Sequence, residues 1–89
     1  MAVVLVPSSL RRYTAQHARL TVEGETVASV LDGFTRTAPE TRGHLFAAEK
    51  LRPFVVVSKN GQDIRLLQGL ETPVGERDEL RILASIAGG

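Results

Sequence analysis

One stretch of this chain has the spacing of a long amphipathic helix, and strand-like segments lie on both sides of it. Thr26 is a suitable N-cap for the helix, and Pro39 ends it, because the residue before a proline is disfavoured in helical geometry. The apolar residues between them follow the i, i+3, i+4, i+7 spacing of one helix face: Val27, Val30, Leu31 and Phe34. A helix with one apolar face has to bury that face, and the neighbouring segments predict that it packs on a sheet.

Two strands are expected before the helix. Residues 2–6 form a continuous apolar run that stops at Pro7, a pattern typical of an inner strand buried on both faces. Residues 19–23 alternate polar and apolar, as in a strand with one face in solvent. A long connection through Tyr13 would join the two as a hairpin.

A short helical turn within residues 42–48 is expected after the helix, and three more strands are expected after that turn. Residues 54–58 are strongly strand-forming, and Asn60 and Gly61 tolerate the positive φ angles of a tight hairpin turn. The chain would then pair back over residues 64–67. A loop over 69–78 would lead to the last strand at 80–86.

This order of elements predicts an α+β fold with a single sheet and one main helix packed across one face. The helix supplies half of the core. The other half comes from apolar strand residues: Val4, Val6, Val22, Val55, Val57, Ile82 and Ile86.

Composition excludes several classes of protein. The chain has no cysteine, which rules out disulfides and thiolate metal sites, and its net charge of +1 is spread too evenly for a nucleic-acid surface. No segment approaches the roughly 20 apolar residues of a membrane-spanning helix, and no secretory leader is visible, so we expect a cytoplasmic protein with no membrane contact.

The sequence does not predict an independent enzyme. His17 and His44 are far apart in sequence and have no third ligand near them, so we expect no metal site and no bound cofactor. Asp78 and Glu79 are adjacent before a strand and would point to opposite faces, which indicates solvated charges in a turn and not a catalytic pair.

Gly88 and Gly89 end the sequence directly after the last apolar run. Glycine has no side chain to clash in a narrow channel and few forbidden backbone angles, so a Gly-Gly end suits a carboxylate that another enzyme must reach. A frayed chain end or a remnant of cloning is the alternative explanation. We therefore expect a globular domain over residues 1–87 and a flexible tail over 88–89.

Some apolar residues exceed what one helix can cover. Four of them are candidates for an exposed partner surface near the tail, on the open face of the sheet: Phe54, Leu66, Leu70 and Ile86. Packing in the core or at a sheet edge explains them equally well.

The whole chain resembles the ubiquitin-like sulfur carrier proteins of the MoaD, ThiS and CysO type, which share the β-grasp fold. The similarity lies in the order and spacing of several short motifs: residues 10–12, 54–57, 60–65, 69–73 and 76–80, and the final Ala87, Gly88 and Gly89. Ala84 and Ser85 stand where many members have a proline, and Ile86 stands where valine is common. Length and residues 60–65 are more similar to CysO and long MoaD-like members than to ThiS.

The resemblance implies a carrier and not a catalyst. An E1-like activating enzyme of the MoeB or ThiF type would adenylate Gly89 with ATP and Mg²⁺, and a sulfur donor would convert it to a thiocarboxylate. A sulfur-accepting synthase, in a cysteine or molybdopterin type of pathway, would then take the sulfur. Gly88 would be needed for activation.

Two other functions stay open. The chain could be a ubiquitin-like modifier joined to lysines through Gly89, or the small subunit of molybdopterin synthase, held in a stable complex with a larger subunit.

Overall fold

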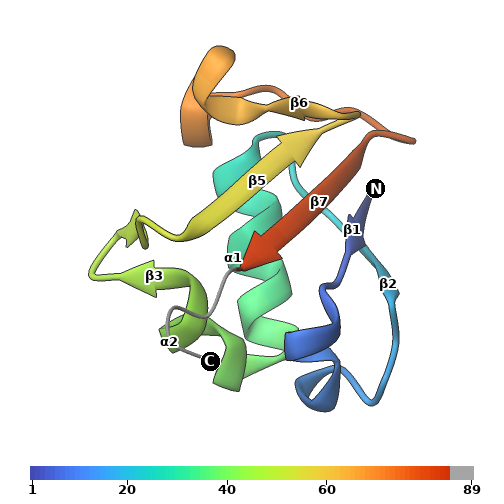
Figure 1. Cartoon of the computed structure of the whole chain (residues 1–89). Helices are drawn as coiled ribbons and strands as arrows, with labels where there is room; N and C mark the ends of the chain where they lie inside the picture. The colour runs from blue at the N-terminus through green and yellow to red at the C-terminus, as the bar shows by residue number, and fades with distance from the viewer. Residues whose placement is uncertain (85–89) are drawn as a thin grey trace.

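The computed structural model describes residues 1–84, and its five-stranded mixed sheet has the order β2-β1-β7-β5-β6 (Figure 1). Strands β1 and β7 are parallel, and all other neighbours in this sheet are antiparallel. The strands are β1 (Ala2–Leu5), β2 (Arg19–Val22), β5 (Val55–Lys59), β6 (Gln62–Asp63) and β7 (Glu79–Ala84).

Helix α1 (Val27–Thr37) packs across one face of this sheet (Figure 1). The short α2 (Arg42–Leu45) leads to a separate two-stranded hairpin of β3 (Phe46–Ala47) and β4 (Lys50–Leu51). The connections contain 3-10 turns: η1 (Ser8–Tyr13), η2 (Pro39–Thr41), η3 (Ile64–Leu66) and η4 (Gly69–Glu71).

The start of α1 confirms the predicted N-cap. The Thr26 hydroxyl accepts a hydrogen bond from the Ser29 N–H at 3.1 Å, and the Ser29 hydroxyl accepts one from the Thr26 N–H at 3.0 Å. This reciprocal capping box satisfies two backbone donors that the first helical turn would otherwise leave unpaired. The four predicted apolar residues are all fully buried: Val27, Val30, Leu31 and Phe34.

The predicted sheet half of the core is confirmed within the described residues. Six of its members are buried: Val4, Val6, Val22, Val55, Val57 and Ile82. The seventh, Ile86, lies outside residues 1–84. Leu10, Leu45, Ile64 and Leu80 also enter this core, although they were not among the predicted core residues.

The prediction that the first strand is buried on both faces is wrong. Strand β1 does lie inside the sheet, between β2 and β7. Ala2 and Val4 are fully buried, whereas Val3 and Leu5 are half-buried. Because α1 covers only one face of the sheet, the alternate side chains of β1 point to an open face.

The hairpin after β5 is confirmed, but the strand predicted over residues 64–67 is wrong. Asn60 and Gly61 have φ angles of 49° and 89° and form the two-residue turn. Strand β6 then ends at Asp63, whose carboxylate accepts a hydrogen bond from the Arg65 N–H at 2.9 Å. This cap starts η3, which buries Ile64 and leaves Leu66 in solvent.

The region between α1 and β5 is only partly as predicted. The helical turn spans Arg42–Leu45 and buries Leu45, but Phe46 already belongs to β3. The β3–β4 hairpin was not predicted. Its turn includes Ala48 with a φ of 58°, a conformation that alanine does not signal in a sequence.

Candidate functional site

The predicted attachment site, Gly89, and the adjacent Gly88 lie outside the described residues, as does Ile86. The expected boundary between a domain over 1–87 and a tail over 88–89 lies outside them too. What the structure describes is the strand that precedes these residues, β7, up to Ala84.

Strand β7 is the central strand of the sheet. It pairs with β1 in parallel from Glu79 to Arg81 and with β5 in antiparallel register from Leu80 to Ala84. Leu80 and Ile82 point into the core and are almost completely buried, which contributes about 1.5–3 kcal/mol for each side chain. The strand that leads toward Gly89 is therefore held on both edges and on one face.

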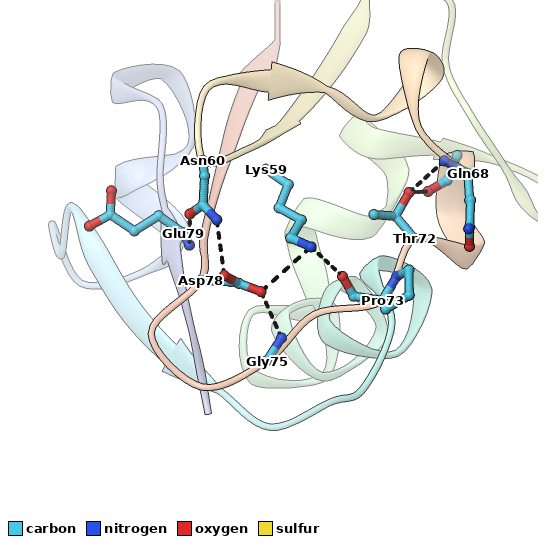
Figure 2. Close-up of polar contacts among 9 residues, drawn as sticks. Lys59, Asn60, Gln68, Thr72, Pro73, Gly75, Asp78 and Glu79 are labelled. Atoms are coloured by element: carbon cyan, nitrogen blue, oxygen red, sulfur yellow. Dashed lines mark hydrogen bonds and ion pairs between the residues drawn. The ribbon is translucent and has the colours of Figure 1, made fainter.

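The start of β7 is fixed by a group of polar contacts centred on Asp78 (Figure 2). The Asp78 carboxylate accepts hydrogen bonds from the Gly75 N–H at 2.7 Å and from the Asn60 side-chain amide at 2.9 Å. The Lys59 ammonium lies 3.7 Å from it. This carboxylate is therefore hydrogen-bonded and is not the solvated charge that the sequence suggested. The Gly75 hydrogen bond, followed by the Asn60 bond, lowers the pKa of Asp78.

Asn60 also holds the first residue of β7. Its backbone N–H donates to the Glu79 carbonyl at 2.8 Å, and its side-chain oxygen accepts from the Glu79 N–H at 2.9 Å. The Glu79 carboxylate in turn lies 3.0 Å from the Arg19 guanidinium on β2. The hairpin turn thus fixes where β7 begins.

The loop before β7 is tied to the start of α1. The Thr72 carbonyl accepts from the Val27 N–H at 3.0 Å, and the Val74 N–H donates to the Glu25 carbonyl at 2.9 Å. The Thr72 hydroxyl accepts from the Gln68 N–H at 3.0 Å (Figure 2). The first two bonds anchor the segment between η4 and β7 to the start of α1, and the third closes the turn around η4.

The face of the sheet opposite α1 is an apolar surface with a basic border. Val56 of β5 pairs with Leu83 of β7, and both side chains lie on this face, as does Leu5 of β1. Leu83 is 51% exposed. Arg81 pairs with Leu5, and Arg11 follows β1 along the same shallow hollow. We call the side chains of Leu5, Val56, Arg81 and Leu83 the open face.

Leu83 was not among the predicted partner residues. The signal was present in the sequence, because the buried Leu80 and Ile82 place Arg81 and Leu83 on the opposite face at a spacing of two.

The predicted partner residues are not gathered on the open face. Phe54 and Leu66 are exposed, by 38% and 81%, but Leu66 lies in η3 at the far edge of the sheet. Leu70 is half-buried in η4, which packs against α1 and not on the open face. Ile86 lies outside the described residues.

Neither histidine is placed as a metal ligand. The His17 ring nitrogen Nδ1 lies 2.8 Å from the Thr14 carbonyl, and the His44 ring stacks on Tyr13 with centroids 5.3 Å apart. Across residues 1–84, no three His, Cys, Asp or Glu side chains gather around a common point where a metal could bind. No helix in the same range has the length and apolar character needed to cross a bilayer.

Comparison with known proteins agrees with this architecture. The sulfur carrier protein CysO of Mycobacterium tuberculosis is 28% identical, over 97% of this chain and 96% of the relative. A chain in the crystal structure of the Amycolatopsis orientalis BexX/CysO complex superposes with a TM-score of 0.91 at 32% identity and covers all of both chains. Small archaeal modifier protein 1 from Methanosarcina acetivorans superposes with a TM-score of 0.87 at 29% identity, over 99% of this chain and 95% of that one.

These neighbours confirm the predicted β-grasp fold and the resemblance to ubiquitin-like sulfur carriers. The sequence profile of the ThiS family matches residues 4–89, which is nearly the whole chain. A mixed sheet with a parallel β1–β7 pair at its centre, one helix across it and a sequence that runs from β7 to Gly-Gly place this chain in the ThiS family of sulfur carriers.

Proposed function

We propose that this sulfur carrier stores its sulfur as a thiocarboxylate on Gly89, at the end of a Gly-Gly tail on a β-grasp domain. The observation that carries the proposal is the extent of the ThiS family match, which continues through β7 to Gly89. The full-length CysO relatives support it. The sequence has no cysteine, so no side-chain thiol competes with the terminus as a place to hold the sulfur.

The chemistry requires an activating partner, because a carboxylate is a poor electrophile. A carboxylate oxygen of Gly89 would attack the α-phosphorus of ATP and release pyrophosphate, leaving an acyl-adenylate. A sulfur nucleophile from a donor would then attack the carbonyl carbon, and AMP would leave. Where the donor is a persulfide, a thiol breaks the remaining S–S bond and the thiocarboxylate is left on the carrier.

We assign ATP and Mg²⁺ to an E1-like adenylyltransferase of the MoeB or ThiF type, because this sequence has no glycine-rich phosphate loop of its own. The need for ATP supports a loading step in the cytoplasm. A synthase would accept the sulfur afterwards, and the CysO relatives favour a cysteine pathway over a molybdopterin pathway. The partner in the BexX/CysO complex supports the idea that such carriers dock on a larger protein.

The open face is a suitable contact surface for the activating enzyme. Leu83 and Val56 lie beside the end of β7, so a protein that covers them also lies next to the segment that follows Ala84.

The deciding experiment is the intact mass of the protein from its native cells, measured with and without a thiol-alkylating reagent. Exchange of one oxygen for sulfur is expected, together with alkylation at Gly89. Alkylation is essential, because oxidation of Met1 adds nearly the same mass. A terminus that stays unmodified after incubation with the activating enzyme, ATP and a sulfur donor would contradict the proposal.

A second function is supported by the likeness to small archaeal modifier protein 1 at 29% identity. In that case Gly89 would be joined to target lysines. Peptides that carry a Gly-Gly remnant on lysine, found in a digest of the same cells, would establish it. A role as the small subunit of molybdopterin synthase would instead show as co-elution with a larger subunit in size-exclusion chromatography.

A further inference from the structure

A groove of about 290 Å³ lies beside β5, on the edge that faces away from β7. Its walls are mainly apolar and come from β4, β5, η3 and η4. They include Leu51, Pro53, Val55, Ile64 and Leu70. Val56 borders both this groove and the open face, whereas the other open-face residues, Leu5, Arg81 and Leu83, do not line the groove.

The groove exists because β6 is too short to cover the edge of β5. The Asn60 N–H donates to the Glu79 carbonyl of β7. In an antiparallel pair the backbone groups alternate in direction, so those of Ser58 and Val56 also bond toward β7. The backbone groups of Lys59 and Val57 point to the opposite edge of β5. Lys59 pairs with Gln62 and Ser58 with Asp63, and the next pair in this register would be Val57 with Ile64. Ile64 already belongs to η3, so the pairing stops at Asp63.

The Asp63 side chain enforces that stop. Its carboxylate accepts hydrogen bonds from the Arg65 N–H at 2.9 Å and from the Arg65 guanidinium at 2.6 Å. The guanidinium bond is the main reason why the pKa of Asp63 is lowered. The chain is turned outward into η3 by these contacts, and Ile64 becomes a wall of the groove. A local hydrogen-bond motif therefore keeps one edge of the sheet from being covered.

The rim of the groove carries positive charge. Lys50, Arg52 and Arg65 all line it, and Asp63 is the acidic residue beside them. Asp63 neutralises Arg65 through their ion pair, which leaves Lys50 and Arg52 with no carboxylate within salt-bridge distance in residues 1–84. The Arg52 Nε donates to the Gly43 carbonyl at 2.8 Å, a bond that positions the guanidinium but keeps its charge.

We propose that this groove binds a short segment of a partner protein in which an apolar side chain is flanked by carboxylates. The apolar side chain would enter between Leu51, Ile64 and Leu70, and the carboxylates would pair with Lys50 and Arg52. A second copy of this chain that docks through the same groove in a two-fold contact is a poor occupant, because the same two cations would face each other. The groove would act beside the sulfur chemistry and does not depend on it.

Selection from a random dodecapeptide phage library on the immobilised full chain tests this proposal. The enriched peptides should carry Asp or Glu next to Leu, Ile, Val or Phe. For a synthetic copy of an enriched peptide, the double variant Lys50→Glu/Arg52→Glu should raise the Kd about tenfold, in line with the loss of two partly exposed charge pairs.

The matched control is Arg12→Glu/Arg77→Glu, which changes the net charge equally but alters two exposed residues outside the groove. It should leave the Kd within about twofold. Circular dichroism establishes that both variants are folded. In ¹⁵N spectra, the peptide should shift the amide signals of Leu51, Ile64 and Leu70 and leave that of Leu83 in place.

Four results would each overturn the proposal. They are an absence of enriched peptides, enriched peptides without acidic residues, equal weakening in both double variants, and amide shifts centred on Leu83. Dimerisation of the free chain that blocks the groove would assign it to a second copy instead. None of these results bears on whether Gly89 carries sulfur.

Discussion

Asn60 and Asp78 are 18 positions apart in the sequence, and the amide of one donates to the carboxylate of the other at 2.9 Å. Asn60 also forms the β5–β6 turn with a positive φ angle and bonds twice to Glu79. One residue therefore forms the hairpin turn and also positions the first residue of the central strand. The predictions about stability begin from this contact.

Replacement Asp78→Ala should destabilise the domain by about 1–2 kcal/mol, because it leaves the Gly75 N–H and the Asn60 amide without their acceptor. Urea unfolding of both proteins measures the difference. Glu76→Ala is the control, since Glu76 is exposed and makes no side-chain hydrogen bond to residues 1–84. An equal loss in the two variants would contradict a special role of Asp78.

The contribution of Asp78 should depend on pH. Its folded pKa is lowered, first by the Gly75 N–H, so its stabilisation is fully present above the unfolded pKa of about 3.9 and is lost as the pH falls through the folded value. The gap in unfolding free energy between wild type and Asp78→Asn should be constant from about pH 7 to 5 and narrow below about pH 4. Asp63 is present in both proteins, so its own lowered pKa cancels in the comparison. A gap that widens in acid would reverse the assigned sign.

Gly24 should not tolerate a side chain. A Cβ atom there would lie 2.7 Å from Val30 Cγ2 and 2.8 Å from the Val30 backbone nitrogen. Gly24→Ala is expected to cost about 1–3 kcal/mol in thermal or urea unfolding. Gly43→Ala serves as the counterpart, because nothing lies within 4 Å of its Cβ position, and it should be neutral or stabilising by up to about 1 kcal/mol.

Leu83→Asp tests the open face as the contact of the activating enzyme. Leu83 is half-exposed but lies in the central strand opposite Val56, so the change should lower the unfolding free energy by about 1 kcal/mol, while carrier-dependent pyrophosphate release falls at least about tenfold. Leu83→Met keeps an apolar side chain and should retain most of the activity. Normal turnover with Leu83→Asp would place the contact elsewhere.

Gly89→Ala should severely impair adenylation and leave the fold intact, because a β-carbon next to the carbonyl crowds the approach of both ATP and the sulfur donor. Deletion of Gly88 and Gly89 should abolish loading completely with no measurable change in the melting temperature. Pyrophosphate release and intact mass after loading are the two measurements. Full turnover of Gly89→Ala would contradict the expected steric effect of a β-carbon at position 89.

The sequence predicted the elements whose signals are local and repeated. Thr26, the four apolar positions of α1 and the Asn60–Gly61 turn each follow a rule that acts within a few residues, and the structure has them all. The buried faces of β5 and β7 follow from alternation in the same way.

The errors arise where a side chain or a distant element decides the outcome. Residues 64–67 have the composition of a strand, but the Asp63 carboxylate caps η3 and ends the pairing. The run at residues 2–6 is apolar on both faces, but only the position of α1 decides which face is buried. Likewise, Leu66 and Leu70 were placed on the open face by hydrophobicity alone, and hydrophobicity does not say which side of a sheet a loop occupies.

The parallel pairing of β1 and β7 means that the strand before the tail is also the central strand, which joins the two halves of the sheet. A nascent chain that has not yet reached Glu79 leaves β1 and β5 without their shared neighbour, so it has neither a complete core nor a complete open face. Such a chain lacks the open face that we propose as the contact of the activating enzyme. The same strand is therefore needed for folding and for loading, so we expect a chain truncated before β7 neither to fold nor to be charged with sulfur.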